Sequence, residues 1–246
     1  MKTLMCALFA CSMAACAADD SAAPDDNAKS GTNEQSIIGG TTDTGDACVV
    51  AVFAHTPGVS SGSLCTGTII GPHSVLTAAH CCSPSTIGTG QEIDILTGPT
   101  LTGPSFVASS AVVNGAWNLN NLFGCHDECI VHTAATLSPV CTLGALNSAA
   151  TVRLVGYGTN THQNGGAGTK RQVTTVVDAL NNVVFQDGNS NAQTCHGDSG
   201  GPAFQGANVV GVTSFGSDPS PTDVCEGGGF HCRVDADLAF INANKN

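Results

Sequence analysis

Short runs of apolar and β-branched residues recur along most of this chain, and glycine, proline, asparagine or aspartate bounds most of them. Such runs favour strands, and the residues that bound them favour tight turns. The chain has 30 glycines and only 4% aromatic residues, a composition typical of many short strands. The pattern predicts an antiparallel barrel or sandwich, with strands over Val49–Phe53, Thr68–Ile70, Ser74–Leu76, Glu92–Leu96, Thr151–Val155, Val173–Val177, Asn182–Phe185 and Val209–Thr213.

Only the carboxyl-terminal stretch, VDADLAFINANKN, has a helical pattern. Asp235 stands where a helix N-cap is expected, and Leu238, Phe240 and Ile241 provide an apolar stripe. We therefore predict one all-β module over residues 37–246 that ends in an α-helix.

The residues before Ile37 differ in composition from the rest. Residues 1–16, MKTLMCALFACSMAAC, combine one lysine with a short apolar run and small residues, which predicts a secretion signal. Residues 17–36 are acidic and weakly hydrophobic, so we expect a disordered propeptide or tether. MAAC resembles the lipobox of bacterial lipoproteins, in which Cys16 would be acylated, and cleavage after Ala17 is the alternative. The chain is thus expected to be secreted or to be a periplasmic or outer-membrane lipoprotein.

Charge and cysteine content bear on partners and compartment. With a formal net charge of −12 and seven Lys and Arg, the chain has little with which to bind nucleic acid or anionic lipid. We expect neither partner, and we expect a monomer. Three of the 13 cysteines lie in residues 1–16, and the other ten predict up to five disulfides in an oxidising compartment.

The stretch TCHGDSGGP, residues 194–202, places glycines on both sides of an Asp-Ser pair. GDSGG fits the pattern G-x-S-x-G of the α/β-hydrolase nucleophile elbow. That fold requires an acid and a histidine after the serine, within βα units. Here His231 is the single histidine after Ser199, and no crossover helix is predicted. The elbow interpretation is therefore poor.

The order His, Asp, Ser has better candidates. His80 follows an apolar run in VLTAAHC, and Asp127 lies in GCHDECIVH. Nucleophilic catalysis by Ser199 needs an imidazole that takes the hydroxyl proton and a carboxylate that fixes the imidazole tautomer. Each residue alone is weak evidence, because a histidine after an apolar strand is most often structural.

Taken together, LTAAHC and GDSGGP resemble the two signature segments of the trypsin/chymotrypsin-like serine peptidases. The resemblance spans residues 37–246, where IIGG, VGYG, TSFG and GGFHCRV also stand in matching order. It implies two six-stranded antiparallel β-barrels with the active site in the cleft between them. It further implies polypeptide substrates, and we expect no cofactor and no metal.

The resemblance implies that His80 is the general base and Ser199 the nucleophile, with the backbone N–H groups of Gly197 and Ser199 as the oxyanion hole. Glycine at 197 leaves that N–H unobstructed. Asp127 is the preferred acid, although Glu128 and Cys129 follow it where the family usually has apolar residues. The other acids fit the family's order less well: Asp94, Asp178 and Asp187.

The resemblance also implies a zymogen, in which cleavage after Ser36 frees the amine of Ile37 to pair with Asp198. Ser36 is not basic, so the family's usual activation site is absent. The alternative is that IIGG is a first strand that is never cut. Gln193 corresponds to the pocket floor, where trypsin-like enzymes have Asp, and this predicts non-tryptic specificity. The other implied substrate-binding residues are Ser214, Phe215, Gly216 and Gly229.

Two disulfides are implied by the resemblance, Cys65–Cys81 and Cys195–Cys225. Threading the remaining cysteines suggests the pairs Cys48–Cys141, Cys129–Cys232 and Cys82–Cys125. A zinc site in HCC or CHDECIVH is the rival interpretation, but the spacing lacks a clean C-x₂-C pair and an exported chain favours disulfides. Glu92 and Asp94 are weak evidence for a calcium loop.

The sequence thus predicts an exported serine endopeptidase that acts through an acyl-enzyme. The alternative is a catalytically inactive homologue that uses the same cleft as a binding module. The presence of His80, Asp127, Ser199 and Gly197 favours the enzyme, because inactive homologues usually lose one such residue.

Overall fold

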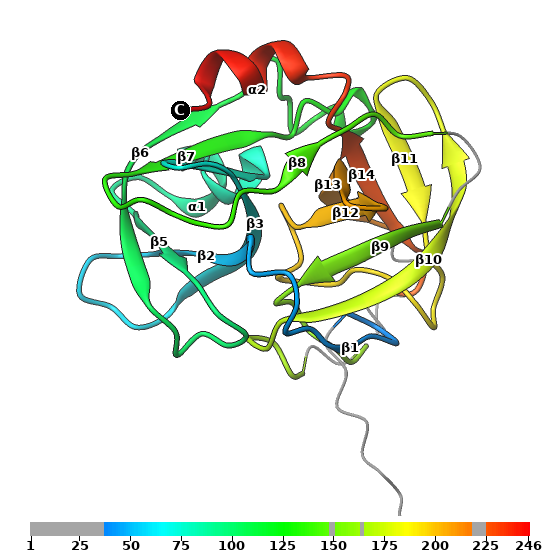
Figure 1. The fold of residues 1–246 in the computed structure, drawn as a ribbon, viewed down its shortest axis with the longest axis horizontal. Coiled ribbons are helices and arrows are strands. Elements are labelled where there is room, and N and C mark those ends of the chain that lie inside the picture. Colours follow the sequence, from blue (N-terminus) through cyan, green and yellow to red (C-terminus); the bar gives the residue numbers. More distant parts are fainter. Residues whose placement is uncertain (1–36, 148–150, 163–164, 218–224) are drawn as a thin grey trace, which may run out of the picture. The chain divides into compact units, whose positions relative to one another are not determined.

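The computed structural model describes residues 37–147, 151–162, 165–217 and 225–246, and strands dominate them (Figure 1). The expected signal, the acidic segment, Cys16 and Ser36 lie outside the described residues. Among the described helices, none is both long and apolar enough to cross a membrane.

The first barrel contains six antiparallel strands from the first half of the chain. They close in the order β2-β3-β4-β7-β6-β5. Apolar side chains from several strands fill it, among them Ile69, Leu76, Ile95 and Ile130, all completely buried. The strands are β2 (Val49–His55), β3 (Gly62–Gly71), β4 (Ser74–Thr77), β5 (Glu92–Leu96), β6 (Ser105–Val113) and β7 (Cys129–Thr133).

The second barrel contains six strands from the second half. Its order is β10-β11-β14-β13-β12-β9, and pairing of β10 with β9 closes the ring. Leu154, Phe185 and Val210 pack in its interior. Two short strands extend the sheet, β1 (Thr41–Thr42) and β8 (Thr142–Leu143). The barrel strands are β9 (Thr151–Gly156), β10 (Arg171–Leu180), β11 (Val184–Asp187), β12 (Pro202–Gln205), β13 (Asn208–Gly216) and β14 (Gly229–Arg233). The prediction of two six-stranded antiparallel barrels is confirmed.

The terminal helix α2 (Leu238–Asn244) forms as expected, but its predicted cap is wrong. The carboxylate of Asp235 binds the guanidinium of Arg233 at 2.9 and 2.6 Å, so it is not available to the helix. Asp237 precedes the first turn and makes no capping bond, because its carboxylate accepts from His126 instead. Three shorter helical segments complete the fold: η1 (Ala79–Cys81), α1 (Pro84–Ile87) and η2 (Leu122–Gly124).

Five disulfides lie in the described part of the chain, and two of the threaded pairings are wrong. Cys82 bonds Cys129 rather than Cys125, and Cys125 bonds Cys232. The reason is spatial: Thr77, at the end of β4, pairs with Cys129, the first residue of β7. The other three are Cys48–Cys141, Cys65–Cys81 and Cys195–Cys225.

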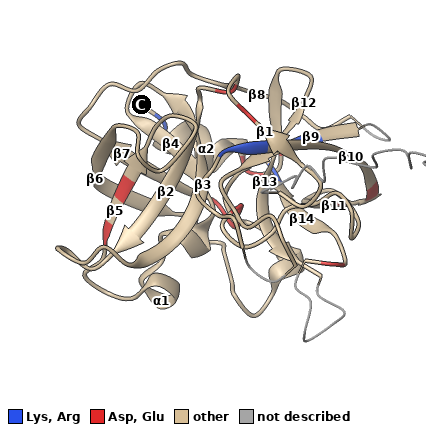
Figure 2. Cartoon of the chain, turned by 90° about the horizontal axis from the view of Figure 1, so that it is seen from below, with Lys and Arg blue, Asp and Glu red and all other residues tan. Residues whose placement is uncertain are grey.

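Basic side chains are few, and Figure 2 shows blue mainly where β1, β9 and β10 come together. Arg153 binds the carboxylate of Asp46, and the ammonium of the buried Lys170 donates to the carbonyls of Asp46 and Val49. These cations therefore bind the segment that leads into β2 of the first barrel, while Arg153 lies in β9 of the second barrel and Lys170 directly precedes β10.

Candidate active site

The segment of Ser199 packs directly against the segment that leads to His80. Gly200 has φ +80°, and a Cβ there would lie 2.0 Å from Oγ1 of Thr77 and 2.6 Å from N of Ala78. Only glycine permits this approach. The carbonyl of Ser199 accepts from N–H of Thr66, 2.8 Å away. Ser199, from the second barrel, thus lies beside the turn of the first barrel that carries His80.

Asp127 contacts His80 twice. Its Oδ2 lies 2.7 Å from Nδ1 of His80, and its Oδ1 accepts from the His80 backbone N–H at 2.9 Å. Oγ of Ser214 donates to Oδ2 at 2.6 Å. Three donors therefore converge on a side chain that is only 3% exposed, so both of its buried oxygens are hydrogen-bonded. With Nδ1–H donating to Asp127, Nε2 of His80 is left to accept a proton.

The backbone around Gly197 fixes the direction of one N–H. The carbonyl of His196 accepts from N–H of Thr159 at 2.7 Å. In a trans peptide the next N–H points the opposite way, so N–H of Gly197 points away from Thr159. Gly197 has φ +97°, a region that favours glycine. Among the described residues, neither this N–H nor that of Ser199 has an acceptor.

Asp198 is completely buried beside the VGYG segment. Its carboxylate accepts from N–H of Gly158 at 2.8 Å and of Cys195 at 2.9 Å. Burial raises the pKa of Asp198 to about 7, and the two N–H donors oppose that rise. A Cβ at Gly156 would lie 2.1 Å from Oδ1 of Asp198, so the glycines of this motif make room for the carboxylate.

The segment that begins at Ile37 also enters the second barrel. Ile37 is completely buried and packs with Leu154 and Phe185. The carbonyl of Ile38 accepts from N–H of Gln193 at 3.2 Å. Ile37 has φ +51°, a conformation that is strained for a β-branched residue.

A cavity of about 220 Å³ opens beside Ser199. Its walls include Thr194, His196, Thr213 and Phe215, together with the Cys195–Cys225 disulfide. Ser214 and Gly216, expected here, also line it.

Two of the expected pocket residues lie elsewhere. Gln193 is 1% exposed, and its amide is used internally: it donates to the carbonyl of Cys225 and accepts from N–H of Gly228. Gly229 lies behind the wall, where a Cβ would meet Oγ1 of Thr194 at 2.5 Å. The backbone of the 225–228 segment thus binds the amide that was expected at the pocket floor.

Comparison with known proteins settles the family. The sequence model of the Trypsin family matches residues 37–239. The chain belongs to the trypsin family. No curated protein matches it.

Three solved structures share the fold. An inactivated protease paralogue of the scabies mite, S-D1, has TM-score 0.68 and 21% identity, covering 84% of this chain and 96% of that one. Human heparin binding protein has TM-score 0.68 and 18% identity, covering 84% and 96%. Neuropsin, a serine protease of mouse brain, has TM-score 0.67 and 21% identity, covering 83% and 97%. At such identities these structures support the fold alone.

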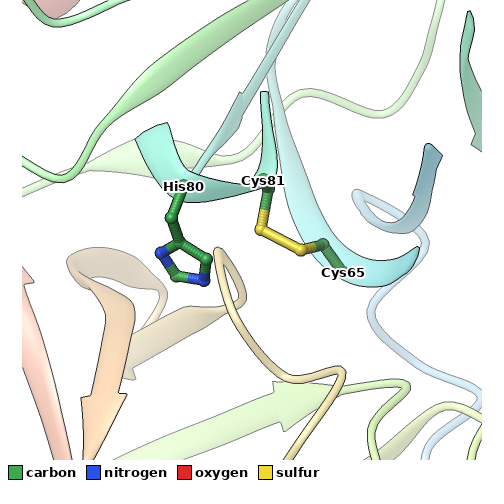
Figure 3. A group of neighbouring side chains, drawn as sticks. All are labelled: Cys65, His80 and Cys81. Atoms are coloured by element: carbon green, nitrogen blue, oxygen red, sulfur yellow. A yellow bond between two sulfur atoms is a disulfide. The ribbon is translucent and has the colours of Figure 1, made fainter. Parts of the chain in front are cut away.

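The zinc interpretation is wrong for this trypsin-family chain. Figure 3 shows His80 beside the sulfurs of Cys65 and Cys81, which are bonded to each other. Cys82, Cys125 and Cys129 are also in disulfides. A sulfur in a disulfide is not the thiolate that zinc requires.

Glu92 and Asp94 lie close to a histidine that the sequence did not associate with them. Nε2 of His55 is 3.6 Å from Oε1 of Glu92 and 3.3 Å from Oδ2 of Asp94. The Thr56 carbonyl, together with these two carboxylates, raises the pKa of His55. The two carboxylates therefore face the His55 imidazole, which the sequence did not place beside them.

Proposed function

We propose that this trypsin-family chain is an exported serine endopeptidase that hydrolyses polypeptides through an acyl-enzyme on Ser199. The observation that carries the proposal is the geometry of Asp127. Three donors, one of them Nδ1 of His80, bind its carboxylate. His80 lies in the turn against which the Ser199 segment packs. This arrangement leaves Nε2 of His80 as the proton acceptor.

The chemistry follows from these positions. Oγ of Ser199 attacks the carbonyl carbon while its proton passes to Nε2 of His80, and Asp127 stabilises the imidazolium. The N–H groups of Gly197 and Ser199 receive the oxyanion of the tetrahedral intermediate. Collapse breaks the C–N bond, and His80 returns the proton to the leaving amine. A water activated by His80 then hydrolyses the acyl-enzyme.

The same proposal includes activation by cleavage after Ser36. Asp198 is buried with two N–H donors and no cationic side chain within salt-bridge distance in the described part of the chain. A new ammonium on Ile37 would neutralise it, and cleavage would remove the steric restriction on φ of Ile37. Because Ser36 is not basic, the activating protease would not have tryptic specificity.

The inactive homologue remains the second candidate, since one of the neighbours is an inactivated protease paralogue. Export is supported by the five disulfides. Secretion and acylation at Cys16 stay the two proposed routes. We propose a monomer whose partners are polypeptide substrates, with no tryptic preference.

The test is proteolysis by the full chain after cleavage before Ile37. A recognition site for a protease that cuts directly before Ile37 replaces the natural sequence there, and a reduced, alkylated protein serves as substrate. We expect new peptide termini by mass spectrometry, and none with Ser199→Ala. Equal products from both proteins, or none from either when both are folded, would reject the peptidase.

A further inference from the structure

A chain of three buried side chains runs from the cavity wall into the second barrel. Oγ1 of Thr213, in the wall, lies 3.2 Å from Nδ1 of His231. Nε2 of His231 lies 3.1 Å from Oδ1 of Asp187. His231 and Asp187 are completely buried, and the imidazole stacks on the ring of Phe185, with centroids 4.9 Å apart.

The surroundings of Asp187 differ from those of Asp127, another Asp that is hydrogen-bonded to a histidine. Three donors hold Asp127. Asp187 has a donor only in His231, and its Oδ2 has no hydrogen-bond partner among the described residues. A carboxylate with one neutral donor and no cation is costly to bury. A pair of Asp187 and His231 that carries no net charge avoids this cost.

When the shared proton lies between Oδ1 of Asp187 and Nε2 of His231, both neutral arrangements place a hydrogen on Nδ1 of His231. In the ion pair, the imidazolium carries hydrogens on both nitrogens and donates from Nε2 to Asp187. In the uncharged pair, the carboxyl O–H of Asp187 donates to Nε2, so the ring hydrogen is on Nδ1. In each case Nδ1–H donates to Oγ1 of Thr213, and the hydroxyl hydrogen of Thr213 is left for another acceptor.

We propose that this hydrogen-bond chain makes the cavity selective for an uncharged acceptor, the side-chain amide of glutamine or asparagine, at the residue whose carbonyl Ser199 attacks. The proposal rests on the proposed peptidase function. Thr213 would donate to the amide oxygen. Thr194, also in the wall and without a hydrogen-bond partner for its hydroxyl among the described residues, would bind the amide nitrogen.

The charges near the cavity disfavour ionised side chains. The described cavity residues include no Lys or Arg to neutralise a carboxylate. A substrate lysine or arginine would bring N–H donors toward the hydroxyl of Thr213. That hydroxyl is itself a donor to the cavity, because its oxygen accepts from Nδ1–H of His231. Asp187 and His231 are thus positioning residues, which act on the substrate only through Thr213.

The test uses the full chain cut before Ile37 and four peptides that differ only at the attacked residue: Gln, Met, Glu or Lys. Met matches Gln in length without its amide. We expect kcat/KM for Gln to exceed that for each of the others by about 10-fold or more. A Met or Lys peptide cleaved as well as the Gln peptide would overturn the proposal.

Two matched pairs of variants assign the effect. Thr213→Val removes the hydroxyl and Thr213→Ser keeps it, so the Gln-to-Met ratio should fall about 10-fold in the first and persist in the second. His231→Asn keeps a donor near Nδ1 and His231→Leu does not, while both remove the ring partner of Asp187. The ratio should be higher in His231→Asn, and equal ratios in folded variants would exclude a positioning role.

Labelling with a serine-directed fluorophosphonate distinguishes a failure of the selectivity proposal from a failure of the proposed peptidase function. If the wild-type protein is labelled at Ser199 and cleaves peptides without preferring Gln, the selectivity proposal is wrong and the peptidase stands. If the folded, cut protein is neither labelled nor active on any peptide, both proposals fall.

Discussion

Oδ2 of Asp127 and Nδ1 of His80 lie 2.7 Å apart, and Oδ1 of the same carboxylate accepts from the His80 backbone N–H. This double contact fixes both the position and the tautomer of the imidazole. Asp127→Asn would present an amide in the same space and favour the wrong tautomer. We expect kcat to fall about 10⁴-fold with little change in fold.

Steady-state kinetics of the cut protein measure this effect, with circular dichroism as the check on folding. Asp94→Asn is the matched control, because the sequence offered Asp94 as a rival acid and it lies beside His55 instead. Retained activity in Asp127→Asn together with a loss in Asp94→Asn would assign the acid to Asp94.

Asp198 gives a prediction about activation. Its burial raises its pKa to about 7, and an ammonium on Ile37 would favour the charged carboxylate and bring that pKa down. Asp198→Asn removes the charge that the ammonium needs, so cleavage before Ile37 should no longer raise the rate of fluorophosphonate labelling. We expect the increase in labelling rate on cleavage to be about 100-fold or more smaller in Asp198→Asn than in the unmodified chain.

The control for this experiment is Asp178→Asn, since Asp178 is exposed on β10. It should gain reactivity on cleavage as the unmodified chain does. If Asp198→Asn also gains fully, the activation pair is wrong and the site is formed without it.

Glu128, next to Asp127, gives a prediction about pH. It is completely buried, and burial together with the nearby Asp237 raises its pKa well above the ordinary 4.5. Asn114 donates to both acids, at 3.3 Å to Glu128 and 3.2 Å to Asp237. The folded state therefore retains a proton that the unfolded state has lost, and folding stability falls as pH rises above about 4.5.

Glu128→Gln removes this titration. We expect the free energy of unfolding of the variant, relative to the unmodified protein, to increase between about pH 5 and about pH 8. Urea unfolding at the two pH values measures it, with Glu92→Gln as the control at a more exposed glutamate. If the unfolding free energies of the variant and the unmodified protein changed equally with pH, Glu128 would have the same pKa in the folded and unfolded states, and the prediction would be wrong.

The Cys82–Cys129 disulfide joins the segment of His80 to that of Asp127. Peptide mapping without reduction should recover a peptide pair containing Cys82 and Cys129, and a second containing Cys125 and Cys232. The double variant Cys82→Ala, Cys129→Ala should lose about 2 to 4 kcal/mol of unfolding free energy. Recovery of a Cys82–Cys125 pair instead would contradict the structure.

Much of the fold was predictable because strand residues and turn residues alternate clearly along the chain. All eight predicted strands overlap strands of the structure, and β5 has the predicted bounds, Glu92–Leu96. Two of the strands that were missed have weaker patterns. β6 exposes most of its small and polar residues, and β12 begins with proline.

The candidate site was less predictable where contacts depend on three-dimensional packing. His80, Asp127 and Ser199 stand in recognisable motifs, and the structure brings their segments together. The environment of Gln193 depends on backbone groups about 30 residues away, at Cys225 and Gly228, which no local pattern reveals. Likewise, Thr213 and His231 come together only because β13 and β14 are paired in register.

The most direct measurement of the central claim is the rate at which a serine-directed fluorophosphonate labels the chain cut before Ile37. We expect rapid labelling at Ser199, no labelling in Ser199→Ala, and a loss of labelling in His80→Ala, in which kcat should also fall about 10⁶-fold. Absence of labelling in the folded, cut protein, or labelling that survives Ser199→Ala, would contradict the account.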